Sequence, residues 1–209
     1  MKPDLDVCAS TLAAYERGAA QYVQESASVT HPTVAAWLSD LSRQLSPRSR
    51  VLELGSGPGY DAEFLEAHDL LVFRTDGARA FVDRLRADGH RAEVLNVATD
   101  PLDGPWDLLL ANAVLHHLTR PQFAAFLTRA VRSLRTGGLF GFTLKQGDGE
   151  GWDVAKLDQA RYFTYWQEPD LRTLLTSTGW RTLRIQHVTG SVQDWLYVTC
   201  AADDDRRDR

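Results

Sequence analysis

The residues with the clearest chemical potential follow two apolar runs of the chain. A turn with glycine at three alternate positions, residues 55–59, comes directly after the apolar run 51–54. Glycine has no Cβ, so such a turn lets backbone amides approach a bound ligand closely. Asp76 ends the stretch that begins with a second apolar run, 70–73. A carboxylate at the end of the second strand of a nucleoside-binding α/β fold accepts both hydroxyls of a ribose.

The spacing of the glycines restricts the ligand. The order is G-x-G-x-G, whereas a dinucleotide-binding turn has G-x-G-x-x-G, and Tyr60 stands where its third glycine would be. Pro58 lies inside the turn and contributes no amide donor. Both departures favour a ligand without a pyrophosphate, and a tight structural turn is the alternative.

Alternating strands and helices are predicted to hold these residues at one edge of a parallel sheet. The predicted strands are 51–54, 70–75, 92–96, 106–111 and 139–144, with helices at 61–68, 78–88, 121–134 and 168–178. Two final strands, 181–188 and 193–201, follow each other without a helix. A dinucleotide-binding fold would normally continue there with another crossover helix.

Two further helices, 8–26 and 32–45, precede the first strand and are extra to the alternating core. A length of 209 residues fits one domain. We expect a single domain over residues 1–202, made of an N-terminal helical cap (1–49) and an α/β core (50–202). The charged end, residues 203–209, is expected to be a disordered tail.

The combination of motifs resembles the class I S-adenosylmethionine (SAM) dependent methyltransferases over about residues 45–200. It consists of Glu53-x-Gly55-x-Gly57-x-Gly59, Asp76, the segment 107–117 that contains Ala-Asn-Ala-Val-Leu-His-His, and Leu-Arg-Thr-Gly-Gly at 134–138. The resemblance implies a Rossmann-like three-layer α/β/α sandwich with a seven-stranded, mostly parallel sheet and an antiparallel last strand. It implies SAM as cofactor, S-adenosylhomocysteine as product, and in-line methyl transfer to an oxygen, nitrogen or carbon atom of a small molecule.

The resemblance also assigns the cofactor contacts. They fall on Tyr22, Glu53, Gly55, Gly57, Gly59, Asp76, Gly77, Asn96, Val97, Asn112 and Ala113. The glycine turn would meet the methionine part, and Glu53 would reach the amino end or brace the turn. Asn96 stands where an acidic residue commonly contacts adenine, and its amide oxygen can still accept a hydrogen bond.

Catalytic and substrate-binding candidates lie after the fourth and fifth strands and in the first helix. His116 and His117 could accept a proton from the acceptor, although adjacent side chains cannot share one helix face. Their frequency in this family, among members with different substrates, favours a shaping role. The substrate-binding candidates are Tyr15, His117, Lys145, Tyr162, Tyr165 and Trp166. For the aromatic run 162–166 and for Tyr15 the alternative is packing, and for Lys145 it is exposure to solvent.

Composition narrows the class of partner. The net charge of −5 disfavours a nucleic acid, which needs clustered positive charge. Cys8 and Cys200 have no metal-ligand spacing, and two cysteines do not make a disulfide framework. A reduced, cytoplasmic setting is therefore expected. The sequence shows no apolar run long enough for a signal core or a membrane span, so no membrane partner is expected. The oligomeric state is not predicted.

Acidic residues in the glycine-rich segment, Asp148, Glu150 and Asp153, could suggest a metal site, but solvation explains them better, so no metal is expected. Two other functions stay open. One is a SAM-binding protein with different chemistry or no catalysis. The other, which the glycine spacing and the terminal strand pair disfavour, is an NAD(P)-dependent oxidoreductase.

Overall fold

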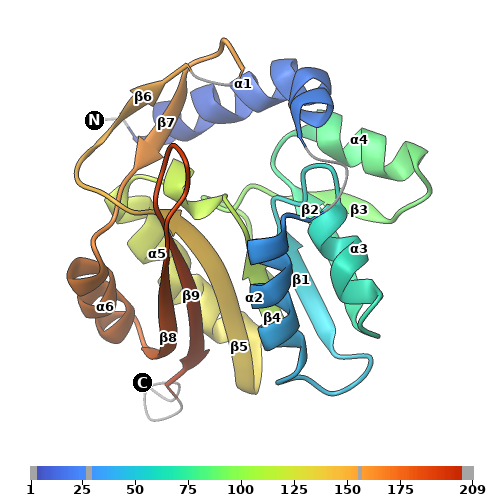
Figure 1. The fold of residues 1–209 in the computed structure, drawn as a ribbon, viewed down its shortest axis with the longest axis vertical. Coiled ribbons are helices and arrows are strands. Elements are labelled where there is room, and N and C mark those ends of the chain that lie inside the picture. Colours follow the sequence, from blue (N-terminus) through green and yellow to red (C-terminus); the bar gives the residue numbers. More distant parts are fainter. Residues whose placement is uncertain (1–3, 27–29, 155–156, 204–209) are drawn as a thin grey trace.

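The protein is built on one twisted sheet, seen in a computed structural model that describes residues 4–26, 30–154 and 157–203 (Figure 1). The strands are β1 (Arg50–Leu54), β2 (Leu71–Asp76), β3 (Ala92–Val94), β4 (Trp106–Ala111), β5 (Leu134–Lys145), β8 (Trp180–Val188) and β9 (Trp195–Ala202). Their order is β3-β2-β1-β4-β5-β9-β8, and β1 to β5 pair in parallel. The last strand, β9, is antiparallel to both β5 and β8. The predicted seven-stranded α/β fold is therefore confirmed.

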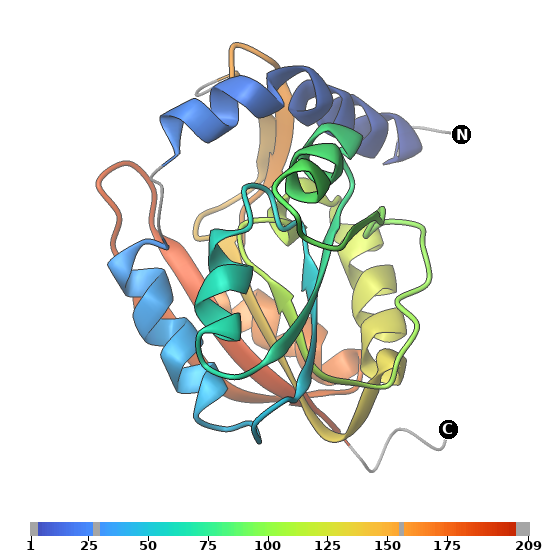
Figure 2. The ribbon, with the colours of Figure 1, turned by 90° about the vertical axis from the view of Figure 1, so that its right-hand side faces the viewer.

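Helices cover both faces of the sheet (Figure 2). They include α2 (Pro32–Ser42), α3 (Tyr60–Glu66), α5 (Arg120–Ser133) and α6 (Glu168–Ser177). Successive strand residues point to opposite faces. Accordingly, Val51 and Leu108 join the core cluster of α2 and α3, whereas Leu52 and Leu109 join that of α5 and α6. This alternation makes the three layers.

A roof lies over the carboxyl ends of the strands. Helix α1 (Asp4–Glu25) crosses the top of the molecule, beside α4 (Arg79–Ala87) and a two-stranded hairpin of β6 (Glu150–Asp153) and β7 (Arg161–Thr164) (Figure 1). Helix α2, which the sequence grouped with α1 in one cap, instead packs on the sheet face. Not one of the described helices has the length and apolar character needed to cross a membrane.

The hairpin corrects one expectation. The glycines of residues 145–151 predict irregular structure, yet β6 begins at Glu150 and Gly151 pairs with Phe163 of β7. Gly147 and Gly149 have positive φ angles and form the turn before the strand. The antiparallel partner β7 thus provides backbone pairing that the local composition does not predict. Residues 204–209, most of the predicted tail, lie outside the described residues.

Candidate active site

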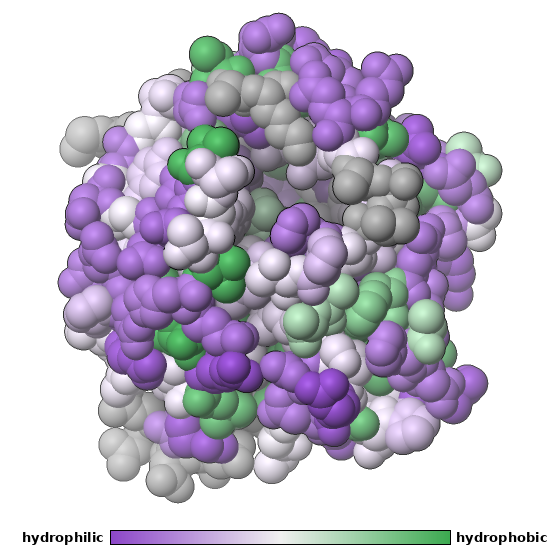
Figure 3. All heavy atoms as spheres, viewed as in Figure 1, coloured by the Kyte–Doolittle hydropathy of each residue, from purple (hydrophilic) through white to green (hydrophobic). Residues whose placement is uncertain are grey.

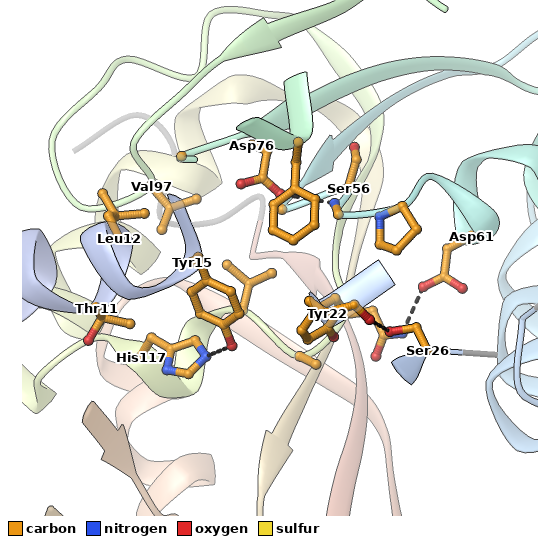
Figure 4. A pocket seen from close by; sticks show the side chains of 18 of the residues that line it. Thr11, Leu12, Tyr15, Tyr22, Ser26, Ser56, Asp61, Asp76, Val97 and His117 are labelled. Atoms are coloured by element: carbon orange, nitrogen blue, oxygen red, sulfur yellow. Dashed lines mark hydrogen bonds between the residues drawn. The ribbon is translucent and has the colours of Figure 1, made fainter. Parts of the chain in front are cut away.

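A cavity of about 430 Å³ lies at the carboxyl ends of the strands, beneath α1. Figure 3 shows the surface hollowed at this place, and Figure 4 shows side chains converging on the cavity from α1 and from the strand ends. Its volume suits a small molecule. Among the predicted residues, the cavity is lined by Tyr15, Tyr22, Gly55, Gly57, Asp76, Gly77, Asn96, Val97, Asn112, Ala113 and His117.

The three glycines of the turn have different roles. All have positive φ angles, but a Cβ on Gly55 would lie 2.3 Å from Val114, and one on Gly59 would lie 2.7 Å from Leu85. A Cβ on Gly57 would meet nothing within 4 Å. Gly57 therefore leaves open space at the cavity, whereas Gly55 is required for packing. Gly59 is the N-cap residue that precedes α3, and it lies outside the described lining.

Asp76 is held by the backbone at the end of β2 and faces the cavity (Figure 4). Its Oδ2 accepts a hydrogen bond from the Gly57 amide at 2.9 Å, and its Oδ1 accepts one from the Ala78 amide at 2.8 Å. Burial raises the pKa of this carboxyl to about 6, so it is mostly ionised at neutral pH. Each oxygen keeps acceptor capacity for two neighbouring hydroxyls.

The segment after β3 forms the apolar end of the cavity, with Leu95 and Val97 facing Leu12 of α1. The amide oxygen of Asn96 accepts hydrogen bonds from the Ala98 amide and, at 3.7 Å, from the Cys8 thiol. That oxygen is therefore already engaged within the protein, and a new bond from an exocyclic amine would have to compete with these two.

Asn112, at the end of β4, links the cavity to a carboxylate that the sequence analysis missed. Its Nδ2 donates to Asp61 Oδ2 at 2.7 Å, and its Oδ1 accepts from the Thr143 hydroxyl at 2.8 Å. Asp61 also accepts a bond from Thr30, and burial raises its pKa. The position of Asp61 in the first turn of the helix after the glycines was the available signal.

Glu53 lies behind the turn. The side chain is 3% exposed, is outside the described lining, and its Oε2 has no hydrogen-bond partner. Burial, and next the charge of Asp61, raise its pKa to about 8. Contact of Glu53 with the amino end of a ligand, directly or through water, stays a prediction. The alternative, bracing the turn, agrees with its bond to Ser56.

His117 is fixed in one tautomer by its partners. Its Nδ1 lies 2.7 Å from the Tyr162 carbonyl oxygen, which can only accept, so Nδ1 carries the proton. Its Nε2 therefore accepts from the Tyr15 hydroxyl at 2.8 Å, a contact drawn in Figure 4. Burial lowers the pKa of His117 to about 3. A neutral imidazole whose lone pair is already used is not an effective base, so the predicted proton-accepting role is not supported.

His116 lies outside the cavity. It is 2% exposed and packs against the rings of Phe163 and Trp195. The two histidines belong to the 3₁₀ turn Leu115–His117, in which neighbouring side chains project about 120° apart. Burial lowers the pKa of His116 well below its usual value. The position of His116 therefore does not support a catalytic role, and that role stays a prediction.

The rim residues predicted to bind substrate serve packing instead. Trp166 is 3% exposed and packs on Phe123, with Arg120 4.2 Å from its ring. Tyr162 packs against Trp152 of the hairpin, and Lys145 places its Nζ 3.6 Å from the Phe163 ring centre. The described lining includes none of Trp166, Tyr162, Lys145 and Tyr165. The first two are buried, and Lys145 and Tyr165 are half-buried. Of the substrate candidates, Tyr15 and His117 line the cavity.

The described residues contain no group of three His, Cys, Asp or Glu side chains that could hold a metal ion. Asp148 instead accepts a hydrogen bond from Gln167. Cys8 and Cys200 are buried and unbridged.

Comparison with known proteins relates this geometry to a family. Residues 52–140 match the family described as a methyltransferase domain. The trans-aconitate 2-methyltransferase of Methylobacterium nodulans is 36% identical over 126 residues, which are 57% of this chain and 46% of that protein. A sarcosine/dimethylglycine N-methyltransferase of Halorhodospira halochloris is 33% identical over 51% of this chain and 41% of that one. The chain spans about half the length of these curated relatives.

Solved structures agree over nearly the whole chain. The 1,6-didemethyltoxoflavin-N1-methyltransferase of Burkholderia thailandensis, with bound S-adenosylhomocysteine, has a TM-score of 0.74 at 18% identity, covering 98% of this chain and 92% of that one. The DhpI–SAH complex has a TM-score of 0.73 at 22% identity, covering 95% and 98%. Residues 52–140 thus match a methyltransferase domain, and the chain shares the Rossmann-like fold of these methyltransferase structures.

Proposed function

We propose that this chain is a SAM-dependent methyltransferase that acts on a small molecule and releases S-adenosylhomocysteine. The carrying observation is the Asp76 carboxylate, anchored on the amides of Gly57 and Ala78 and facing the cavity beside an open glycine turn. A ribose diol needs two adjacent acceptors, and a cofactor with cationic groups suits an acidic wall. The matched methyltransferase domain includes these residues.

Each wall of the cavity is proposed to contact one part of the cofactor. Asp76 accepts the ribose hydroxyls, and the apolar pair Leu12 and Val97 holds the adenine. Gly55, Gly57 and the segment Asn112–Ala113 meet the methionine part, and Tyr22 closes the cavity from α1. The sulfonium of bound SAM supplies an activated methyl group; this chain's residues exclude water and orient the acceptor for in-line attack.

In the proposed function, His117 has a structural role. Its hydrogen bonds to Tyr15 and Tyr162 join α1, the segment after β4 and the hairpin. These bonds fix the Tyr15 ring against the cavity. Tyr15 and His117 therefore hold the roof in position. Neither side chain takes the proton of the acceptor, which is lost to solvent.

Two alternatives are weaker. A SAM-binding protein with other chemistry would share the cofactor residues, so only an activity assay separates it. An oxidoreductase using NAD(P) is disfavoured by the G-x-G-x-G turn and by the antiparallel pair β8–β9. We further propose a cytoplasmic setting, supported by two unbridged cysteines, and no nucleic-acid partner, supported by the net charge of −5.

Calorimetric titration with SAM, S-adenosylhomocysteine and NADH tests the proposal. We expect micromolar binding of the first two ligands and none of NADH. Asp76→Ala should weaken binding at least about tenfold, because a charge-assisted hydrogen bond contributes about 1.5–3 kcal/mol. Asp83→Ala, an exposed carboxylate on α4, is the matched control. Tight NADH binding, or no binding of SAM, would contradict the proposal.

A further inference from the structure

Among Asp, Glu, Lys and Arg side chains, only acidic ones stand in the described lining of the cavity. Three carboxylates line it, from Glu25 at the end of α1, Asp61 in α3 and Asp76 at the end of β2. The described lining contains no lysine or arginine. Asp61 and Asp76 are held by hydrogen bonds from within the protein, so their positions are fixed. An acceptor anywhere in this cavity meets fixed negative charge.

Two cations close to lining residues, Arg161 and Lys145, lie outside the described lining and are engaged by other side chains. Arg161 is 5% exposed and donates to the Tyr15 hydroxyl oxygen at 3.2 Å, from behind the Tyr15 ring. Lys145 has its ammonium group against the Phe163 ring. A carboxylate in the cavity would lose its hydration without gaining a cation in exchange, which is unfavourable. SAM itself carries a carboxylate, but its ammonium and sulfonium make the cofactor cationic as a whole.

Tyr15 restricts the acceptor further. Its hydroxyl proton is used on His117 Nε2, and one lone pair of its oxygen accepts from Arg161. The oxygen therefore offers the cavity a remaining lone pair and no proton. A group that donates N–H or O–H satisfies this oxygen, whereas an anionic oxygen would be repelled by it.

The kinds of nucleophile can be compared on these grounds. Carboxylates, phenolates, thiolates and enolates all attack as anions, which the acidic wall opposes, and His117 is unsuited to generate them. A nitrogen atom of low basicity attacks in its neutral form and needs no base before the step. An N–H on such a nitrogen can also donate to Tyr15.

We infer, building on the proposed function, that the acceptor is a neutral aromatic amine or ring nitrogen and that anionic substrates are excluded by the acidic, cation-free cavity wall. In the step, the nitrogen lone pair forms the N–C bond, and the electrons of the breaking C–S bond neutralise the sulfonium. Positive charge thereby moves from sulfur to nitrogen within the acidic wall. Where the nitrogen bears a proton, that proton leaves to water afterwards.

Matched fragments test this inference on the full chain saturated with S-adenosylhomocysteine. Aminoquinolines, quinoline carboxylates and methylquinolines, substituted at the same ring positions, share one ring and differ in charge and donors. Ligand-observed NMR titration gives their dissociation constants. We expect the amines to bind at least about tenfold more tightly than the carboxylates. Equal or tighter binding of carboxylates, or no binding by any of the three, overturns the inference.

Charge reversal provides a local control. Glu25→Lys places a cation at the cavity and should tighten quinoline carboxylate binding by about threefold or more, the range of one partly exposed ion pair. Asp83→Lys makes the same charge change at an exposed position of α4 outside the described lining and should leave that affinity unchanged. Equal effects of the two variants overturn the inference. Binding of S-adenosylhomocysteine, measured first, tests the proposed function separately.

Discussion

The two walls of the cavity are built in different ways. On the strand side, the contacts are local in sequence: Gly57 and Asp76 are 19 residues apart, and Thr75 bonds Glu53 across 22 residues. In the roof, Tyr15 meets His117 across 102 residues and Arg161 across 146. The strand side depends mainly on backbone groups, the roof on side chains. Substitutions in the roof can therefore alter which acceptor fits the cavity, while the backbone contacts of the strand side stay the same.

The largest expected effect concerns the segment that follows the β6–β7 hairpin. Trp166→Ala should lower the free energy of unfolding by about 3–5 kcal/mol, because it empties a buried site between Phe123 and Arg120. Trp152→Ala, at a side chain 51% exposed, should cost about 1 kcal/mol or less. Urea unfolding of both variants measures this. A stable Trp166→Ala protein that lost only substrate binding would restore Trp166 as a pocket residue.

The glycine turn should separate folding from ligand binding. Gly55→Ala should cost about 2–4 kcal/mol of stability, since its Cβ would overlap Val114 and the φ angle is left-handed. Gly57→Ala should cost only about 1–2 kcal/mol of stability, because the left-handed φ angle is unfavourable for alanine but the added Cβ meets no other atom. Yet Gly57→Ala should weaken S-adenosylhomocysteine binding at least about tenfold, measured by calorimetry. Unchanged affinity in Gly57→Ala would show that the open space beside this glycine is not used.

Tyr15→Phe should loosen the roof without unfolding the strand side. It leaves His117 Nε2 without a donor, at a cost of about 1–3 kcal/mol in the free energy of unfolding. Cofactor affinity should change less than about threefold. The ¹⁵N chemical shifts of His117 in the unmutated protein should show the proton on Nδ1 at neutral pH. Tyr165→Phe, outside the cavity lining, is the control. A protonated Nε2 would contradict the assigned hydrogen bonds.

The smallest effect concerns the carboxyl behind the turn. The pKa of Glu53 is raised to about 8 from 4.5, so the folded protein keeps a proton that the unfolded chain loses between these values. Its contribution to stability is therefore present below pH 4.5 and declines as the pH rises towards 8. Relative to the unmutated protein, Glu53→Gln should gain stability progressively between pH 5 and pH 8 in urea unfolding. Glu93→Gln, exposed in β3, should show no such trend.

The two walls also differ in how far the sequence predicts them. The apolar runs and the glycine turn indicated every strand of the main sheet, because a buried parallel strand and its turn are local patterns. Asp76 and Gly57 were placed at the cavity for the same reason. Whether Gly59 and Glu53 face a ligand or the core is less predictable, because it depends on the direction of each residue at the strand end.

The roof could not be predicted in this way. The role of Lys145 and of residues 162–166 depends on β6–β7 pairing, which buries aromatic side chains that resemble a binding surface in the sequence. His117 depends on α1, which contributes Tyr15 from a distant part of the chain. Asp61 was missed because an acidic residue in a first helical turn is common without any ligand.

A crystal structure of the full chain with S-adenosylhomocysteine tests the central claim most directly. We expect both ribose hydroxyls within about 3 Å of the Asp76 carboxylate oxygens, the adenine between Leu12 and Val97, and the sulfur inside the cavity beneath α1. A ligand bound elsewhere, or bound here with its ribose away from Asp76, would contradict it.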